Sequence, residues 1–446
     1  MPKSIPQFLV KRPITSLSLG FLITILIGTI LLLLPWATHR GISFIDALFT
    51  ATSATCVTGL VVKNTGIDFT LFGQIVILFL IQLGGLGIMT GAAFVFLLFK
   101  RIGIRAGAGF KTVLEEEYIS EVKKTIKFII LSTFILEIIG VIFLFFWWQG
   151  NFPDLGRAVF SSIFHSISAF CNAGFSLFKN SLENFRGDVF TNVIISSLII
   201  LGGIGFLVLR DVQHKITSFF KKEKAKWTLH SKLVLISTLL LIFLGAALFY
   251  IFERENLNFL TGKEMVLTSF FQSITARTAG FNTVNIGGLS SPTILLLMFL
   301  MFIGGAPGGT AGGIKVISLA LIFLSIISFF KRKGEVEVFG RTIPKIKFRN
   351  VFILVSIYLS FCLVISILML YTEKGDFEGI LFEVFSATGT VGLSTGITPH
   401  LTGIGKILIT LSMFVGRLLP LSLAIIGLRE LIKPEINYLE EKVVLG

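Results

Sequence analysis

The sequence predicts an all-α integral membrane protein built from four tandem repeats, each a span, a re-entrant pore helix and a second span. Eight transmembrane helices and four pore helices would then surround one central pore with pseudo-fourfold symmetry. One observation is the composition: the 446 residues are 54% hydrophobic and 14% charged, and their mean hydropathy is +0.89. A soluble domain carries about 25% charged residues. The other is a short motif ending in glycine that recurs four times, at a period of roughly 110 residues, too long for a solenoid unit.

Eight apolar stretches are long enough to cross the hydrocarbon core of a bilayer, which is about 30 Å thick. They lie near 17–35, 71–99, 128–148, 191–209, 233–252, 293–330, 351–371 and 404–428. The first ends at Pro35 without a small-residue cleavage pattern, so it is predicted to be a span and not a removed signal peptide. The predicted repeats are 17–105, 120–220, 230–335 and 348–430.

The basic residues are concentrated on one predicted face of the membrane. Seven Lys or Arg residues fall in each of 100–127, 210–232 and 331–349. Only nine fall in the four segments on the other face, which are 36–70, 149–190, 253–292 and 372–403. The positive-inside rule therefore places the three basic loops and both termini, 1–16 and 431–446, in the cytoplasm. This role accounts for the net charge of +14 and disfavours nucleic acid as a partner.

The recurring motif occupies 53–59, 168–174, 274–280 and 386–392. A phenylalanine stands ten residues before each of the four closing glycines, at Phe49, Phe164, Phe270 and Phe382. The stretches before the glycines, such as 43–55 and 378–388, are too short to span, so we expect re-entrant helices. Ordinary extracellular loops between simple spans are the alternative, but such loops would not be expected to repeat both the phenylalanine and the glycine four times. Since irregular backbone at membrane depth must be buried or line water, the four loops predict an internal cavity that narrows toward the outside.

The four loops are candidates for a cation-binding ring made of backbone carbonyl oxygens. Glycine permits the backbone angles that such a ring needs, and potassium-channel filters use similar Thr-Val-Gly loops. The candidate ligands, for K⁺ in preference to Na⁺, are Val57, Thr58, Gly59, Asn172, Ala173, Gly174, Thr278, Ala279, Gly280, Thr390, Val391 and Gly392. No acidic residue lies in the four positions before any of these glycines, which favours carbonyl coordination. Arg277 is expected to point away from the axis.

A glycine pair follows each loop within the second span of the first three repeats, but the fourth repeat has Gly416-Arg417. An arginine facing lipid costs at least about 2.5–3.5 kcal/mol, so Arg417 should face the interior. There it would oppose the leak of cations. A structural ion pair between Arg417 and Glu137 is the alternative.

The third repeat carries a glycine-rich segment that cannot form a continuous helix, because glycine and proline both break helices. The residues of this candidate gate are Gly304, Gly305, Ala306, Pro307, Gly308, Gly309, Thr310, Ala311, Gly312, Gly313 and Lys315. We expect a mobile intramembrane loop beneath the four glycine motifs. A small-residue packing seam is the alternative, but it would not contain a proline.

Four non-identical span–pore helix–span repeats, each with one glycine that closes its pore loop, resemble the Trk/Ktr/HKT superfamily of potassium transporters. The resemblance covers nearly the whole chain. With only 16 residues before its first span, the chain is most similar to the KtrB-type membrane subunits of Ktr systems. Gly59 differs from the serine of some Na⁺-favouring HKT proteins. The resemblance implies channel-like K⁺ uptake across the bacterial inner membrane, coupling to Na⁺, and gating by 304–315 and Arg417. It also implies a homodimer and a cytoplasmic nucleotide-binding ring (KtrA-like) as partner.

Two other functions remain open: an alternating-access secondary cation carrier and a Na⁺-permeable member of the same superfamily. The repeats are predicted to be parallel, whereas many carriers have inverted repeats. An enzyme is not expected, because His165 and His214 have no acid pair or nucleophile at a catalytic spacing. No covalent cofactor is expected, and the three cysteines form no metal or disulfide pattern. The basic loops and residues 440–442 are candidate docking surfaces for the partner.

Overall fold

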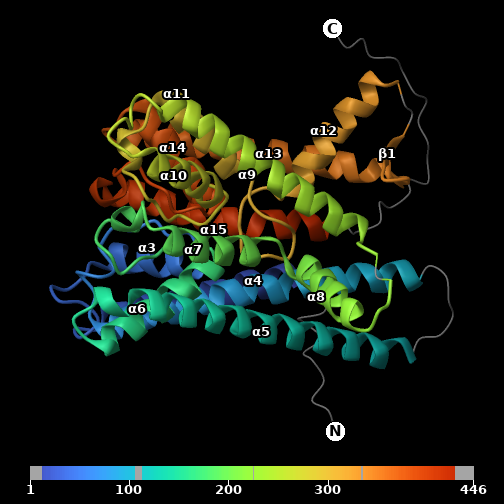
Figure 1. The fold of residues 1–446 in the computed structure, drawn as a ribbon, viewed down its shortest axis with the longest axis horizontal. Coiled ribbons are helices and arrows are strands. Elements are labelled where there is room, and N and C mark those ends of the chain that lie inside the picture. Colours follow the sequence, from blue (N-terminus) through green and yellow to red (C-terminus); the bar gives the residue numbers. More distant parts are fainter. Residues whose placement is uncertain (1–12, 106–112, 225, 333–334, 427–446) are drawn as a thin grey trace.

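The computed structural model describes residues 13–105, 113–224, 226–332 and 335–426. The N-terminal segment through residue 12, the tail 431–446 and the candidate docking residues 440–442 lie outside the described residues. Within the described part, six helices are long and apolar enough to cross a membrane. They are α2 (Pro13–Leu33), α4 (Leu71–Arg105), α5 (Val113–Trp148), α9 (Leu229–Glu253), α13 (Lys345–Thr372) and α15 (Gly403–Ile426). The long helices labelled in Figure 1 run roughly along the longest axis of the molecule, as expected for a helical membrane protein.

Four shorter helices gather at one end of the molecule, which we name the short-helix end (Figure 1). They are α3 (Phe44–Thr55), α6 (Leu155–Phe170), α10 (Gly262–Thr275) and α14 (Phe377–Gly389). Each begins at a capping side chain that accepts a hydrogen bond from the backbone N–H three residues further on. The four caps are Ser43, Asp154, Thr261 and Asp376. The same kind of start signal therefore begins all four short helices, although its distance from the loop glycine differs between repeats.

Two of the predicted spans are broken. The prediction of one helix over 191–209 is wrong, because α7 (Val189–Gly203) and α8 (Phe206–Phe220) meet at an angle of 106°. Gly205 has a φ of +83° at this bend. A Cβ there would lie 2.5 Å from the carbonyl oxygen of Pro307, so the bend packs closely against a segment of the third repeat.

The predicted break within 293–330 is present. Two shorter apolar helices, α11 (Ser291–Phe302) and α12 (Val316–Phe330), flank an irregular segment at 303–315, which we name the glycine-rich loop.

The all-α prediction is wrong at one place, a small antiparallel hairpin of β1 (Val336–Val338) and β2 (Arg341–Ile343). Phe339 and Gly340 both have positive φ, as a two-residue type I′ turn requires. The hairpin lies at the opposite end from the short helices (Figure 1). Four 3₁₀ turns complete the described elements: Gln149–Asn151, Glu183–Phe185, Ile286–Gly288 and Thr398–His400.

A glycine in the following helix lets that helix approach the end of the short helix in repeats 1, 2 and 4. A Cβ on Gly84 would lie 1.9 Å from the carbonyl oxygen of Thr55, the last residue of α3. The corresponding contacts join Gly202 to Phe170 at 1.8 Å and Gly416 to Thr388 at 1.9 Å. Because real atoms never approach so closely, only glycine allows this packing.

We therefore expect Gly84→Ala to lower the melting temperature of the purified protein by several degrees, since overpacking costs about 1–3 kcal/mol. Gly20→Ala is the matched control, because it also replaces a helical glycine but nothing lies within 4 Å of the new Cβ. Thermal unfolding in detergent, followed by size-exclusion chromatography, measures the effect. Equal melting temperatures for the two variants would contradict the packing argument.

Candidate cation-binding site

The four glycine loops share one unusual backbone conformation. Two residues before each glycine, φ is again positive: 55° at Val57, 60° at Asn172, 76° at Thr278 and 49° at Thr390. The glycines that follow have φ values of 95°, 68°, 83° and 97°. Left-handed angles are costly for residues other than glycine, above all for β-branched ones, and such strain concentrates at functional sites. The same strained geometry in four repeats indicates a shared structural demand.

A hydroxyl near the end of each short helix holds the loop in this conformation. Ser53 and Ser386 each accept the N–H of the loop glycine, Gly59 and Gly392, at 3.1 Å. In the other two repeats the hydroxyl donates to the carbonyl oxygen after the glycine. Those bonds join Ser168 to Phe175 at 2.8 Å and Thr275 to Phe281 at 2.7 Å. A serine six residues before the glycine, or in repeat 3 a threonine five residues before it, therefore stabilises each loop.

The structure brings the four glycines together in a closed ring. A Cβ on Gly59 would lie 2.3 Å from the carbonyl oxygen of Ala173 in the second loop. A Cβ on each of the four glycines would likewise lie 2.2–2.6 Å from a carbonyl oxygen of the next loop, and the fourth loop contacts the first. The remaining contacts join Gly174 to Ala279, Gly280 to Val391 and Gly392 to Thr58. The order around the ring is therefore repeat 1, 2, 3, 4, with repeats 2 and 4 opposite each other.

A cavity of about 410 Å³, which we name the outer cavity, opens at this ring and is lined by all four glycines. Most of its other lining groups are polar side chains of the loop residues that follow, including Ser176 and Ser394. Its two charged side chains, Lys179 and Glu183, have opposite signs. Burial raises the pKa of the Glu183 carboxyl, although hydrogen bonds from Asn180 and Asn282 act against the shift. Polar side chains and charged side chains of both signs thus line the outer cavity.

The glycine-rich loop contacts the ring loops of repeats 2, 3 and 4. Hydrogen bonds join it to neighbouring backbone and side-chain groups. They are Ala306 N to Gly203 O at 2.8 Å, Thr310 N to Gly202 O at 3.0 Å, Phe206 N to Gly308 O at 3.2 Å, Thr310 Oγ1 to Phe170 O at 3.0 Å and Gly312 N to Thr278 Oγ1 at 3.0 Å. A Cβ on Gly312 would lie 1.9 Å from Thr390 Oγ1. Thr310 Oγ1 also lies 3.3 Å from Asn172 Oδ1, so the loop contacts three of the four strained positions.

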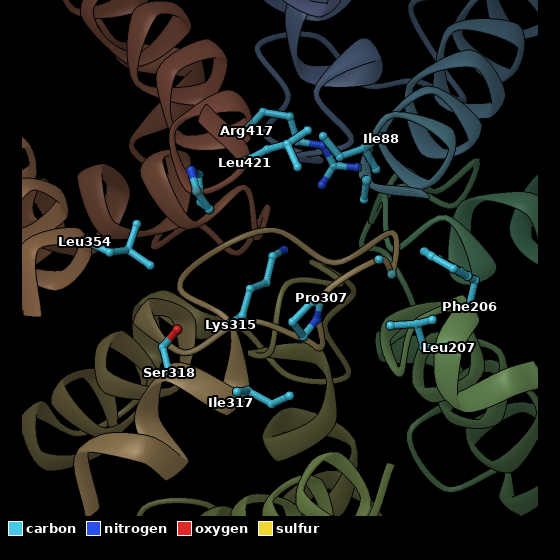
Figure 2. Close-up of a pocket in the computed structure, with 14 residues that line it drawn as sticks. Ile88, Phe206, Leu207, Pro307, Lys315, Ile317, Ser318, Leu354, Arg417 and Leu421 are labelled. Atoms are coloured by element: carbon cyan, nitrogen blue, oxygen red, sulfur yellow. The ribbon is translucent and has the colours of Figure 1, made fainter. Parts of the chain in front are cut away.

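A second cavity of about 260 Å³, the inner cavity, borders the glycine-rich loop at Pro307, Gly308 and Gly309. Figure 2 shows Lys315 and Arg417 reaching into the space between this loop and the helices that carry Ile88 and Leu421. Lys315 Nζ donates to Ala311 O at 2.8 Å and to Gly312 O at 3.3 Å. Within the described residues, Arg417 Nε and Nη2 have no hydrogen-bond partner, although only 3% of the residue is exposed. Two cations therefore line one cavity, and the Lys315 ammonium holds the loop.

Two further buried charged residues, Glu137 and Arg277, contact neutral groups. Glu137 Oε2 accepts from Gln82 at 3.3 Å, so the alternative ion pair with Arg417 is not formed. Arg277 contacts the backbone and hydroxyl oxygens of Thr238 on α9, both at 3.5 Å. It is not among the residues that line the outer cavity, in keeping with the expectation that it points away from the axis.

Sequence reasoning missed two buried side chains behind the ring, His165 and Glu383, each nine residues before its loop glycine. His165 Nε2 lies 2.9 Å from Ser176 Oγ, and Glu383 Oε1 lies 2.9 Å from Ser394 Oγ. The signal was present as the repeated strings Gly-Phe-Ser at 174–176 and Gly-Leu-Ser at 392–394. It was missed because each partner lies 11 residues away along the chain.

The chain is similar to known cation transport proteins over most of its length. Residues 6–436 match the family model described as TrkH, cation transport protein. The chain is 41% identical to the Ktr system potassium uptake protein B of Bacillus subtilis, with 92% of each chain covered. It is 39% identical to the potassium/sodium uptake protein NtpJ of Enterococcus hirae, with 97% of each chain covered.

The fold is similar to the crystal structure of the potassium transporter TrkH from Vibrio parahaemolyticus. The TM-score is 0.71 at 23% sequence identity, and the match covers 92% of this chain and 84% of the other. At that identity the likeness concerns the fold alone. The family match and the two relatives together carry the assignment: the chain belongs to the TrkH family of cation transport proteins.

Proposed function

We propose that this protein is the K⁺-translocating subunit of a potassium uptake system and conducts K⁺ through the ring of four glycine loops. The closed ring of strained loops is the observation that carries the proposal. Backbone carbonyl oxygens can replace the water shell of K⁺, as they do in channel filters. The twelve ring residues named from the sequence would then be the filter. Two relatives named for potassium uptake support K⁺ as the ion.

The proposed topology has eight transmembrane helices and four re-entrant pore helices. Six long helices, the bent pair α7 and α8, and the flanking pair α11 and α12 would supply the eight spans. The basic loops support an orientation with the short-helix end on the outer side of the cell membrane and both termini in the cytoplasm. In this orientation the outer cavity receives the ion and the inner cavity releases it.

The glycine-rich loop and Arg417 are proposed to gate this path. A positive charge about 6 Å from a passing K⁺ would repel it by roughly 3 kcal/mol at an effective dielectric constant near 20. The unpartnered guanidinium nitrogens in the inner cavity support that role, because no carboxylate neutralises Arg417 among the described residues. The hydrogen bonds of the loop to repeats 2 and 3 and its close packing against Thr390 of repeat 4 support a closed state.

Regulation and ion coupling belong to the same proposal. The sodium in the name of the Enterococcus hirae relative supports a dependence on Na⁺. The membrane subunit would form a homodimer, and a cytoplasmic nucleotide-binding ring would dock on its basic loops. The name of the Bacillus subtilis relative, protein B of a Ktr system, supports a partner subunit. An alternating-access carrier fits less well, because one continuous ring already joins all four repeats.

We expect Gly59→Ser to reduce the preference for K⁺ over Na⁺, since its Cβ would displace the carbonyl of Ala173. Gly41→Ser is the matched control, because Gly41 also has a positive φ but no neighbour within 4 Å. Fluxes of both ions into proteoliposomes measure the preference. Wild-type protein that passes Na⁺ as fast as K⁺ would defeat the K⁺ assignment.

Arg417→Gln should raise basal K⁺ flux about tenfold or more, because a repulsion of roughly 3 kcal/mol is removed from the path. Arg417→Lys keeps the charge and should leave the flux close to that of the wild type. Isotope uptake without any cytoplasmic partner measures both variants. If Arg417→Gln conducts like the wild type, the residue has only a structural role.

Deletion of residues 306–311 should increase K⁺ uptake in the absence of a cytoplasmic partner. Thr310→Val should act in the same direction but less strongly, since it removes only the hydroxyl that bonds Phe170. Thr268→Val is the control, because that buried hydroxyl has no partner among the described residues. A deletion variant that is folded but inactive would count against the gate.

A further inference from the structure

Two opposite loops of the ring carry a serine two positions after the glycine. Ser176 and Ser394 both line the outer cavity, one from repeat 2 and the other from repeat 4. In both loops the serine oxygen accepts the backbone N–H two residues further on, from Phe178 at 3.0 Å and from Gly396 at 2.9 Å. The remaining question is where each serine directs its hydrogen.

His165 determines the direction in repeat 2. Its Nδ1 lies 2.8 Å from the carbonyl oxygen of Ser161, which can only accept, so Nδ1 carries a hydrogen. His165 is fully buried and makes no ion pair with a carboxylate among the described residues, and a buried charge without a partner is costly. The ring is therefore neutral and its Nε2 is an acceptor. The hydroxyl of Ser176, 2.9 Å away, must donate its hydrogen to Nε2.

Glu383 determines the direction in repeat 4. This fully buried carboxyl accepts the hydroxyl hydrogen of Ser394 at 2.9 Å on Oε1, and Thr398 donates to the same oxygen. Oε1 remains an acceptor whether or not the other carboxyl oxygen carries a proton. The hydrogen of Ser394 is thus directed away from the outer cavity, as it is for Ser176.

With its hydrogen directed backward and one lone pair taken by a backbone N–H, the Ser176 oxygen has one lone pair left. The Ser394 oxygen also has one lone pair left, because Thr398 Oγ1, 3.0 Å away, directs its single hydrogen at Glu383 Oε1. Since both serines line the outer cavity, that lone pair is available to a ligand there. A hydroxyl that turned its hydrogen toward the cavity would instead repel a cation. The two oxygens stand on opposite sides of the ring, so they can act on one ion near its axis.

We propose that His165 and Glu383 are positioning residues for a second, outer cation site. They fix the hydroxyls of Ser176 and Ser394 so that both oxygens face a partly hydrated monovalent cation before it enters the ring. The inference rests on the proposed K⁺ conduction. Repeats 1 and 3 carry Thr50 and Phe271 at the same distance from their glycines, and Thr50 bonds Asp46 O within its own helix.

The test is a double-mutant cycle in proteoliposomes that compares the K⁺ concentration for half-maximal uptake (KM) with the maximal rate. Glu383→Leu and Ser394→Ala should each raise KM about threefold to tenfold, the range of one hydrogen-bonding group. The double variant should be no worse than either single variant, because both changes remove the same oriented oxygen. Glu383→Gln keeps a carbonyl acceptor of the same shape and should restore a KM close to the wild-type value.

The repeat-2 arm provides an independent check if Glu383→Leu fails to fold. His165→Phe and Ser176→Ala should each raise KM, and the double variant should have a KM no higher than either single variant. Thr50→Val, at the position in repeat 1 equivalent to His165, should leave KM unchanged. Unchanged KM with a lower maximal rate in the folded variants of both arms would overturn the inference, and so would additive effects. Wild-type protein without saturable K⁺ uptake would instead overturn the proposed function.

Discussion

The mutual approach of four backbone loops is the constraint on which this structure depends. At each step around the ring, the carbonyl oxygen of the next loop occupies the place that a Cβ would take. One larger residue would therefore push apart two repeats and not merely strain one turn. Gly84, Gly202 and Gly416 allow equally close contacts between the ends of the short helices and the helices that follow them. The four repeats can converge only because glycine stands both in the ring loops and at these helix contacts.

The convergence also sets the electrostatics at the centre. Each short helix ends close to its ring loop, at Thr55, Phe170, Thr275 or Gly389. The C-terminal end of a helix carries about half a negative charge, contributed by carbonyl groups without helical partners. Four such ends around one ring favour a cation without any ionised carboxylate at the ring itself. This agrees with the absence of acidic residues from the four positions before each glycine. Fixed dipoles also need not reorganise when an ion arrives.

Features that repeat along the chain could be predicted, whereas features that join different repeats could not. The four glycines, the short helices and the interruption at 303–315 follow from local composition and register. The bend at Gly205 could not be foreseen, because it packs against the carbonyl oxygen of Pro307, about a hundred residues further on. His165 looked isolated for a related reason, since its partner Ser176 lies beyond a strained turn. Turn geometry of this kind leaves no periodic pattern in the sequence.

The third repeat departs from the symmetry of the ring, and in the proposed function this departure is the gate. A Cβ on Gly304, near the start of the glycine-rich loop, would lie 1.8 Å from the carbonyl oxygen of Gly312 in the same loop, whereas the corresponding glycine of each other repeat packs against its short helix. The loop therefore replaces a rigid contact with five hydrogen bonds to its neighbours. Each contributes about 0.5–1.5 kcal/mol net, so opening would cost roughly 2–8 kcal/mol. Reversing a closed-to-open ratio of 99:1 takes about 5.5 kcal/mol of differential binding. The cost of opening thus lies within the range that one bound partner can supply.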